Sequence, residues 1–301
     1  MQLVLDHISK SYGRNKALSE FSATLSPGVY ALLGPNGSGK STLMNIITDN
    51  LKADGGSILF SEGEMPPENA RSLGARYREK IGYMPQYPQL YPNFTVEQFM
   101  WYMATLKDIG RGYKGKERKK LIEEQIDRLL AEVELSDVKT SLVGSLSGGM
   151  KQRLALAQAV MGDPSILILD EPTAGLDPKQ RISIRNYISR IAFNKIVIIA
   201  THVVSDVEFI AREAIMLKKG VISDSGSPYE LTQKIEGQVW QTVVAAEEVQ
   251  AMQEKFRVVN IQNGEQGVIL RILSDVQPTE DSVTVVPSLE DYYLYVFGDI
   301  L

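Results

Sequence analysis

The stretch GPNGSGKST, residues 34–42, decides most of what this sequence predicts. A short apolar run at residues 28–33 leads directly into it, and residues 42–47 follow with helical spacing. In such an order of strand, glycine loop and helix, backbone N–H groups turn inward around an anion at a helix N-terminus. The stretch therefore predicts phosphate binding, in which Lys40 reaches the β- and γ-phosphates and Ser41 binds Mg²⁺.

The composition limits what else the chain can be. It has 301 residues, of which 44% are hydrophobic and 23% charged, as is ordinary for a globular protein. The formal net charge of -5 gives no global basic field to attract nucleic acid, so we expect no nucleic-acid partner. The absence of cysteine excludes disulfides and cysteine-bound zinc, and it fits a reducing compartment.

The hydropathy pattern predicts neither a secretion signal nor a membrane span. The first ten residues, MQLVLDHISK, carry an acid within the apolar run and no basic leader. No apolar run approaches the roughly 20 residues that a membrane-spanning helix needs. We expect a chain that is soluble by itself, so any role at a membrane would come through a partner.

The order of patterns predicts an α/β fold for the first 234 residues. Residues 2–8 alternate like a half-buried strand, and the apolar runs at 166–169 and 196–200 are typical of buried parallel strands. Residues 93–160 have helical spacing, with one apolar face formed by Leu121, Ile122, Ile126, Leu129, Leu130 and Val133. We therefore expect a parallel sheet interrupted by a helical subdomain at about residues 93–160.

The remainder, residues 235–301, predicts a small α+β domain. Four short strands are expected at residues 238–245, 256–262, 267–274 and 283–286. Asn263-Gly264 is the expected turn between the second and the third of them. Because the sequence has no internal repeat and no second glycine loop, we expect one nucleotide-binding unit per chain.

A second motif, ILILDEPTAGLDP at residues 166–178, supplies acids. A buried strand that ends in Asp170 places a carboxylate beside the phosphate loop, where it can hold Mg²⁺. Glu171 follows at once, and its carboxylate could orient and deprotonate an attacking water. The alternative is a strand end whose two acids simply face solvent, which the nearby phosphate loop makes the weaker interpretation.

A third motif, LSGGMKQRLALAQAV at residues 146–160, provides a second anion-binding helix start at Ser147-Gly148-Gly149. One nucleotide does not need two such loops from a single subunit. Two chains that met head to tail could each close the other's site. Taken alone, the same triplet would be an unremarkable turn.

These motifs together resemble the ATPase subunit of an ATP-binding cassette (ABC) transporter across residues 1 to about 230. GPNGSGKST is similar to the Walker A motif, LSGGM to the signature and ILILDEP to the Walker B motif. AGLD, residues 174–177, is similar to the D-loop, and Gln86 in GYMPQ to the Q-loop glutamine. His202 in IIATHVVSDVE resembles the switch histidine, and Tyr12 in KSYGRNKAL the aromatic residue that stacks on adenine. Met150 departs from the glutamine that often follows SGG.

The resemblance implies a RecA-like P-loop NTPase core with N-terminal antiparallel strands, with ATP and Mg²⁺ as cofactors. It implies three catalytic residues: Glu171 as the base, His202 on the γ-phosphate, and Gln86 near the metal and the water. The implied metal ligands are Ser41, Gln86 and Asp170. The implied nucleotide-binding residues are Tyr12, Gly34, Asn36, Gly37, Ser38, Gly39, Lys40, Ser41, Thr42, Ser147, Gly148, Gly149 and Asp177, of which the last four would act at the dimer seam.

Some of these residues have simpler interpretations. Taken alone, Gln86 would be a surface amide, Tyr12 a turn aromatic and His202 a strand-end residue; only their order around the phosphate loop favours function. The basic run at residues 114–120 is more typical of a solvated helix end than of a lipid-binding patch.

The resemblance also implies partners: transmembrane permease subunits and a second ATPase subunit, identical or closely homologous. It places the chain on the cytoplasmic face of a bacterial membrane. The tail Leu289-Glu290-Asp291-Tyr292 resembles the ending of bacterial antibiotic, lantibiotic and multidrug exporter ATPases, which favours export of a drug, peptide or similar compound. An ordinary helix start capped by Ser288 is the alternative for this tail. An importer ATPase and a non-transport cassette ATPase also stay open for the chain.

Overall fold

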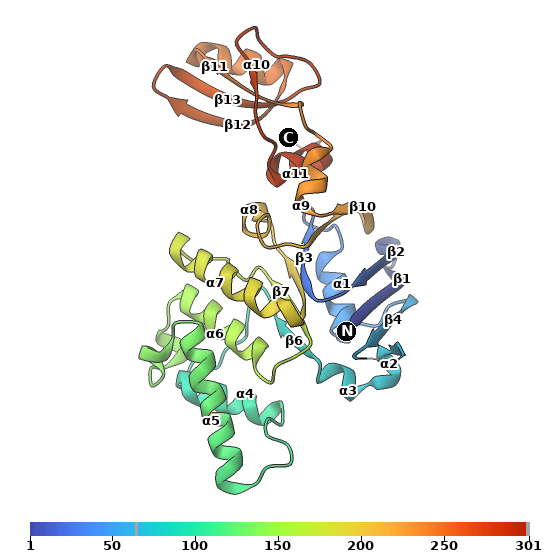
Figure 1. Cartoon of the computed structure of the whole chain (residues 1–301), viewed down its shortest axis with the longest axis vertical. Coiled ribbons are helices and arrows are strands. Elements are labelled where there is room, and N and C mark those ends of the chain that lie inside the picture. The colour runs from blue at the N-terminus through green and yellow to red at the C-terminus, as the bar shows by residue number, and fades with distance from the viewer. Residues whose placement is uncertain (64–65, 299–301) are drawn as a thin grey trace.

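The computed structural model describes residues 1–63 and 66–298, and its centre is a six-stranded sheet (Figure 1). The strand order is β10-β9-β3-β8-β7-β6, in which only the pairing of β10 with β9 is antiparallel. The strands are β3 (Gly28–Leu33), β6 (Ile81–Met84), β7 (Ile166–Asp170), β8 (Ile196–Ala200), β9 (Glu213–Lys218) and β10 (Val221–Gly226).

The central strands are parallel because crossovers that contain helices connect them, and both faces of the sheet are buried. Every residue of β8 is buried, as its unbroken apolar run predicts. In the register of β8, Ile196 pairs with Gly28 of β3 and with Ile166 of β7, so the three strands begin level with one another. Their carboxyl ends therefore meet at one edge, which is where ligands bind in open α/β sheets.

A second, antiparallel sheet with the order β2-β1-β4-β5 packs beside the first. Its strands are β1 (Gln2–Tyr12), β2 (Asn15–Leu25), β4 (Gly55–Ser61) and β5 (Glu68–Asn69). Leu3, Ile8 and Phe21 share a core with Tyr30 of β3 and Leu43 of α1. This packing fixes the hairpin tip that carries Tyr12.

Three longer helices lie between β6 and β7 in the chain: α4 (Val96–Leu106), α5 (Gly115–Glu132) and α6 (Gly148–Val160). Thr95 and Gln98 form a capping box at the start of α4. The predicted apolar face of α5 is buried at Ile122, Ile126, Leu129 and Leu130. The basic run at residues 114–120 covers the largely exposed start of α5, as a solvated helix end should.

The remaining helices are α1 (Lys40–Ile47), α2 (Ala70–Leu73), α3 (Ala75–Arg78), α7 (Pro178–Ile191), α8 (Val204–Val207), α9 (Pro228–Gln233), α10 (Val249–Lys255) and α11 (Leu289–Phe297). Short 3₁₀ turns occur at Ser136–Val138, Val143–Ser145, Ala192–Asn194 and Ala246–Glu248. Among the described residues, none of the helices combines the length and the hydrophobicity needed to cross a bilayer.

The C-terminal strands form a third, antiparallel sheet at the end of the molecule opposite α4 and α5 (Figure 1). Its order is β12-β13-β11-β14, built from β11 (Val239–Val244), β12 (Arg257–Gly264), β13 (Gly267–Leu273) and β14 (Val283–Thr284). All four predicted strands are present, with limits that differ by a few residues.

The predicted turn at Asn263-Gly264 is wrong. Both residues belong to β12, where Asn263 pairs with Val268 and Gly264 pairs with Gly267. The two residues between Gly264 and Gly267, Glu265 and Gln266, make the turn. Gly267 closes the hairpin at a φ of +146°, where a Cβ would lie 2.7 Å from the carbonyl oxygen of Val244. The conformational demand therefore falls on the glycine after the turn.

The architecture confirms the α/β class, with a mainly parallel sheet and N-terminal antiparallel strands. The domain limits, 1–234, about 93–160 and 235–301, stay predictions. Residues 299–301, at the end of the last range, lie outside the described residues.

Candidate functional site

The phosphate loop follows β3 directly and turns into α1 at Lys40. Gly39 has a φ of +112°, and a Cβ at this position would lie 2.5 Å from the carbonyl oxygen of Ala17. At Gly34 a Cβ would lie 2.2 Å from the carbonyl oxygen of Leu217. Only glycine fits these two positions, so the neighbouring strands themselves shape the loop.

The Lys40 side chain lies back on its own loop. Its Nζ donates to the carbonyl oxygens of Gly34, at 2.6 Å, and Pro35, at 3.1 Å. Burial lowers the pKa of Lys40, and the carboxylates of Glu171 and Asp170 partly offset this effect. An anion in the loop would offer the ammonium group a stronger partner than these carbonyls.

Asp170 is the last residue of β7, level with the end of β8 where it pairs with Ala200. Burial, and then the nearby carboxylate of Glu171, raise the pKa of Asp170 to about 6, although Lys40 opposes them. A cation bound nearby would therefore stabilise the ionised form of Asp170. The structure brings the two predicted motifs together, as the common edge of parallel strands requires.

The carboxylate of Glu171 is held by the segment that follows β8. Its Oε2 accepts from the Thr201 hydroxyl at 2.9 Å, and its Oε1 accepts from the backbone N–H of His202 at 2.9 Å. The Nδ1 of His202 lies 2.7 Å from the same Oε1. In this conformation the side chain of His202 is thus engaged with the predicted base.

The backbone of Glu171 is fixed as firmly as its side chain. Its φ of +52° lies in the left-handed region, which costs a non-glycine residue on the order of 1–3 kcal/mol. Its N–H donates to the Ala200 carbonyl at 2.8 Å, and its own carbonyl accepts from Gln152 Nε2 at 2.6 Å. Gln152 lies on α6, so the helix that starts with the signature triplet holds the residue next to Asp170.

One cavity of about 570 Å³ joins most of the predicted site. Its predicted members are Tyr12, Asn36, Gly37, Ser38, Gly39, Lys40, Ser41, Thr42, Gln86, Asp170, Glu171 and His202. Tyr12 is 51% exposed at its rim and is not a core residue, and Lys10 Nζ lies 5.9 Å from the centroid of its ring. The exposed Gln86 enters from the segment just after β6.

The other predicted residues do not line this cavity in the described chain. Gly34 lies beneath the loop and forms its base. Ser147 is the N-cap of α6, where its Oγ accepts from Met150 N–H at 3.2 Å, and Asp177 is the N-cap of α7, where its Oδ1 accepts from Gln180 N–H at 2.9 Å. Gly148 and Gly149 begin α6, and Gly149 packs near Gln180 and Leu176. Unlike Gly34, the residues at the starts of α6 and α7 therefore form a separate surface, which the same chain does not fold onto its own phosphate loop.

The oxygen atoms that the cavity offers suit Mg²⁺. Ser41, Gln86 and Asp170 offer hydroxyl, amide and carboxylate oxygens to the same cavity, and Mg²⁺ prefers oxygen ligands. Among the described residues no cluster of three histidine, cysteine or acidic side chains could form a metal cage. This suits an ion that takes one or two protein oxygens and completes its shell with phosphates and water.

Two residues of the site were missed by the sequence analysis. Thr201 bonds to Glu171, and its position next to His202 was the available signal. Gln152 is 7% exposed, and only its place as a polar residue in the apolar helix after the SGG triplet hinted at a buried role. A threonine or a glutamine in a sequence does not by itself show which backbone group or carboxylate its side chain will hydrogen-bond.

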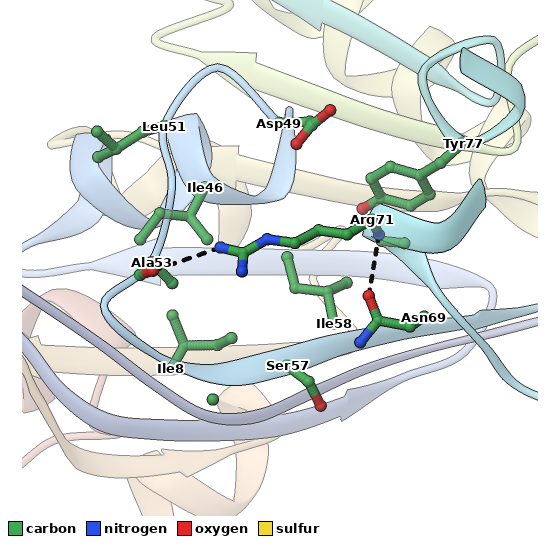
Figure 2. A pocket seen from close by; sticks show the side chains of 12 residues that line it. Ile8, Ile46, Asp49, Leu51, Ala53, Ser57, Ile58, Asn69, Arg71 and Tyr77 are labelled. Carbon is green, nitrogen blue, oxygen red and sulfur yellow. Dashed lines mark hydrogen bonds between the residues drawn. The ribbon is translucent and has the colours of Figure 1, made fainter. Parts of the chain in front are cut away.

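A second, much smaller cavity of about 40 Å³ lies between the antiparallel sheet and the first helices (Figure 2). Figure 2 shows Arg71 reaching across it, where Nη2 donates to the Ala53 carbonyl at 3.3 Å. Tyr77 closes one side through a hydrogen bond from its hydroxyl to the Ile47 carbonyl. The space is too small for a nucleotide, so we assign it to packing behind α1.

The phosphate loop after one parallel strand and the acid pair after another define a P-loop nucleoside triphosphatase. Comparison with known proteins narrows this class. The family model described as ABC transporter matches residues 18–174, which is just over half of the chain. The chain belongs to this family of ATP-binding cassette ATPases, which bind and hydrolyse ATP.

Curated relatives of several kinds match the chain. "Uncharacterized ABC transporter ATP-binding protein YxlF" of Bacillus subtilis is 33% identical over 234 residues, covering 77% of this chain and 73% of the relative. "Nod factor export ATP-binding protein I" of Rhizobium etli is 35% identical and covers 76% and 69%. "Arginine transport ATP-binding protein ArtM" of Bacillus subtilis is 31% identical and covers 75% and 91%.

Solved structures agree with the fold. CbiO1 from Clostridium perfringens, described as part of the ABC transporter complex cbiONQ, superimposes with a TM-score of 0.65 at 30% identity and covers 77% of this chain and 90% of its own. A dimeric, post-hydrolysis state of the cassette MJ0796 bound to ADP and Pi has a TM-score of 0.64 at 27% identity, covering 75% and 98%. Both superpositions leave about a quarter of this chain uncovered.

Proposed function

We propose that this chain hydrolyses MgATP in a site that a second ATPase subunit completes, and that the cycle drives separate transmembrane subunits. The observation that carries the proposal is the division of the predicted residues between two surfaces. One cavity holds the phosphate loop, Asp170, Glu171 and His202, whereas Ser147 and Asp177 cap helices elsewhere. A head-to-tail pair of chains would bring the second surface of each onto the first surface of the other.

The proposed roles follow from the contacts. The loop amides and Lys40 bind the phosphates, and Tyr12 stacks on the adenine at the cavity rim. Glu171 acts as the base once His202 turns from Oε1 to the γ-phosphate, because that turn leaves a carboxylate oxygen available to a water. The resting engagement of Glu171 would keep a solitary subunit from rapid hydrolysis.

Mg²⁺ would be held by Ser41, Gln86 and Asp170, with the phosphates as further ligands. Bound there, the ion neutralises charge that develops on the phosphates. The raised pKa of Asp170 means that this residue becomes a better ligand as the pH rises through about 6.

The surface beside Gln86 supports a protein partner. Tyr87, Tyr91 and Tyr102 are 76%, 45% and 36% exposed, and the ring of Tyr91 meets that of Tyr102 edge to face at 5.2 Å. Exposed aromatic groups of this kind mark interaction sites. We assign this surface to the transmembrane subunits, which would place the chain on the cytoplasmic face of a bacterial membrane.

Export of a drug, peptide or similar compound is our proposed direction, supported by the exporter-like tail and by the relatives named for Nod factor export. In the structure the tail forms the first turn of α11 with Ser288 as its cap, so its helix-forming role accounts for part of that pattern. Import is the second candidate, because relatives named for arginine transport and for sulfate/thiosulfate import are about as similar. A non-transport cassette ATPase is the remaining alternative.

The shared site is tested by the mass of the particle in solution. Light scattering should find Glu171→Gln as a dimer with MgATP and as a monomer without it. Adding Ser147→Arg should abolish the dimer while ATP binding to the monomer persists, whereas Ser136→Arg, at an exposed serine of the same helical region, should have no effect. An ATP-dependent dimer that tolerates Ser147→Arg would contradict the head-to-tail arrangement.

The direction requires a membrane system. The chain can be co-expressed with any polytopic membrane protein that a neighbouring gene encodes. Inside-out vesicles are then prepared so that ATP is supplied on the cytoplasmic side. An exporter would fill these vesicles with fluorescent dyes or labelled peptides, and the Glu171→Gln chain would not. Emptying of preloaded vesicles by ATP would favour the importer, and a chain that fails to associate with any membrane protein would favour the non-transport alternative.

A further inference from the structure

The segment that carries His202 continues into a very short helix. Thr201 and His202 bind the carboxylate of Glu171, and α8 then runs only from Val204 to Val207. A helix of four residues has no stability of its own, so packing must determine where it lies. The position of His202 therefore depends on what holds α8.

The C-terminal helix α11 is one of the elements that hold it. Val204 and Val207 of α8 are buried in the same core as Leu289 and Tyr292 of α11. Figure 1 shows α8, α9 and α11 grouped at the junction between the central sheet and the C-terminal sheet. The two helices are far apart in the sequence, so the contact between them arises from the tertiary fold.

A polar link joins the end of α8 to the start of α11. The half-buried Glu208 directly follows α8, and its Oε1 accepts from the backbone N–H of Leu289 at 2.8 Å, across 81 positions. The first N–H groups of a helix lack partners within the helix, and a carboxylate also interacts favourably with the helix dipole there. Ser288 and Asp291 form a capping box that serves the same turn, so Glu208 completes its hydrogen bonding.

Two other polar anchors of α11 lead away from the His202 segment. Lys218 Nζ, at the end of β9, donates to the Val296 carbonyl at 3.2 Å. The Tyr292 hydroxyl bonds to Asp224 of β10. These contacts hold the same helix without touching the residues that follow β8, which makes them suitable comparisons.

We propose that Glu208 is a positioning residue for ATP hydrolysis: by binding Leu289 it docks α11 against α8 and thereby fixes where His202 stands relative to Glu171. This inference rests on the roles proposed above for His202 and Glu171. It assigns the C-terminal segment a part in the reaction, because the docked α11 packs against the segment that carries His202. ATP affinity is not involved, since neither Glu208 nor α11 lines the nucleotide cavity in the described chain.

The test is steady-state ATP hydrolysis by the full-length chain. Glu208→Ala should lower kcat about three- to tenfold, the range expected for the net loss of one hydrogen bond, and should leave KM for ATP within about twofold. Glu208→Gln should largely restore kcat, because its amide oxygen can accept from Leu289 N–H. Lys218→Ala, which loosens α11 at its other end, should keep the parent kcat.

A double-mutant cycle with His202→Ala separates positioning from a general loss of stability. If Glu208 acts through His202, Glu208→Ala should cause no further loss of kcat in the His202→Ala chain. An equal loss in both backgrounds, or a kcat for Glu208→Ala that matches the parent, would overturn the inference. So would a Lys218→Ala chain as slow as Glu208→Ala. Full activity of His202→Ala would instead refute the proposed site, a result that is distinguishable from the others.

Discussion

The nucleotide-binding part of the chain and its C-terminal part are stabilised in different ways. Around the phosphate loop, chemically important residues sit at strand ends, and neighbours in sequence such as Asp170 and Glu171 serve one site. In the C-terminal part, polar contacts join distant positions: Arg271 binds Asp291 at 2.6 and 2.8 Å, and Glu208 binds Leu289. Residues that act on a ligand leave compact motifs, whereas residues that attach one part of a fold to another do not.

The largest effect expected in either part is at Glu171. Glu171→Gln should reduce kcat about a thousandfold, within the range for a lost general base, because the amide cannot take a proton from water. ATP affinity should persist, since the amide keeps the size of the side chain. Single-turnover hydrolysis and nucleotide titration measure the two quantities.

Glu123→Gln is the matched control, because Glu123 is exposed on α5. It should hydrolyse ATP like the parent. If the Glu171→Gln chain hydrolysed ATP at the parent rate, Glu171 would not be the base of the proposed mechanism. The nucleotide-binding part would then lose the residue on which its side of the comparison depends.

The sequence predicted the nucleotide-binding part better than the contacts that depend on tertiary packing. The order of strand, loop and acids predicted the cavity, because parallel strands that begin in register end at one edge. The contacts of Thr201 and Gln152 with Glu171 could not be predicted, since they depend on how β8 and α6 pack against β7. The hairpin turn was placed wrongly because a favourable Asn263-Gly264 pair lost to the pairing of the strands around it.

The C-terminal part should respond most to the loss of Arg271. Asp291 is only 3% exposed; its burial acts to raise its pKa, but the hydrogen bonds from Arg271 and Ser288 outweigh burial and lower it. Arg271→Met leaves this acid without its cation and should destabilise the docking of α11 by about 2 kcal/mol. Faster hydrogen exchange of the amides in Leu289–Phe297 would reveal it.

KM for ATP should not change in Arg271→Met, because this pair is remote from the nucleotide cavity. Lys255→Met removes an exposed cation from the same region and should leave exchange in α11 as it was. If both variants loosened α11 equally, the pair would be no more than a surface contact.

A smaller effect is expected at the rim of the nucleotide site. Tyr12→Ala should raise KM for ATP about tenfold with little change in kcat, since the stacking of a base on an aromatic ring contributes about 1–3 kcal/mol. Tyr12→Phe keeps the ring and should bind ATP as the parent does. A rise in KM for the phenylalanine variant would mean that the hydroxyl, rather than the ring face, holds the nucleotide.

The smallest effect concerns the stability of the nucleotide-binding part itself. Burial and Glu171 raise the pKa of Asp170 to about 6, above the value of about 4 in an unfolded chain, so the folded state is penalised when Asp170 is ionised. Asp170→Asn should therefore stabilise the nucleotide-free protein at pH 7 by about 1 kcal/mol, a value reduced for the partial exposure of the carboxylate. The gain should shrink as the pH falls below 6 and vanish only well below 4, where the parent carboxyl is protonated in both states. Thermal unfolding at pH 7 and pH 5, with the exposed Asp137→Asn as control, measures this difference. If the higher Tm of Asp170→Asn did not depend on pH, the gain would come from packing. The charge of the Asp170 carboxylate would then not be what limits stability at this strand end.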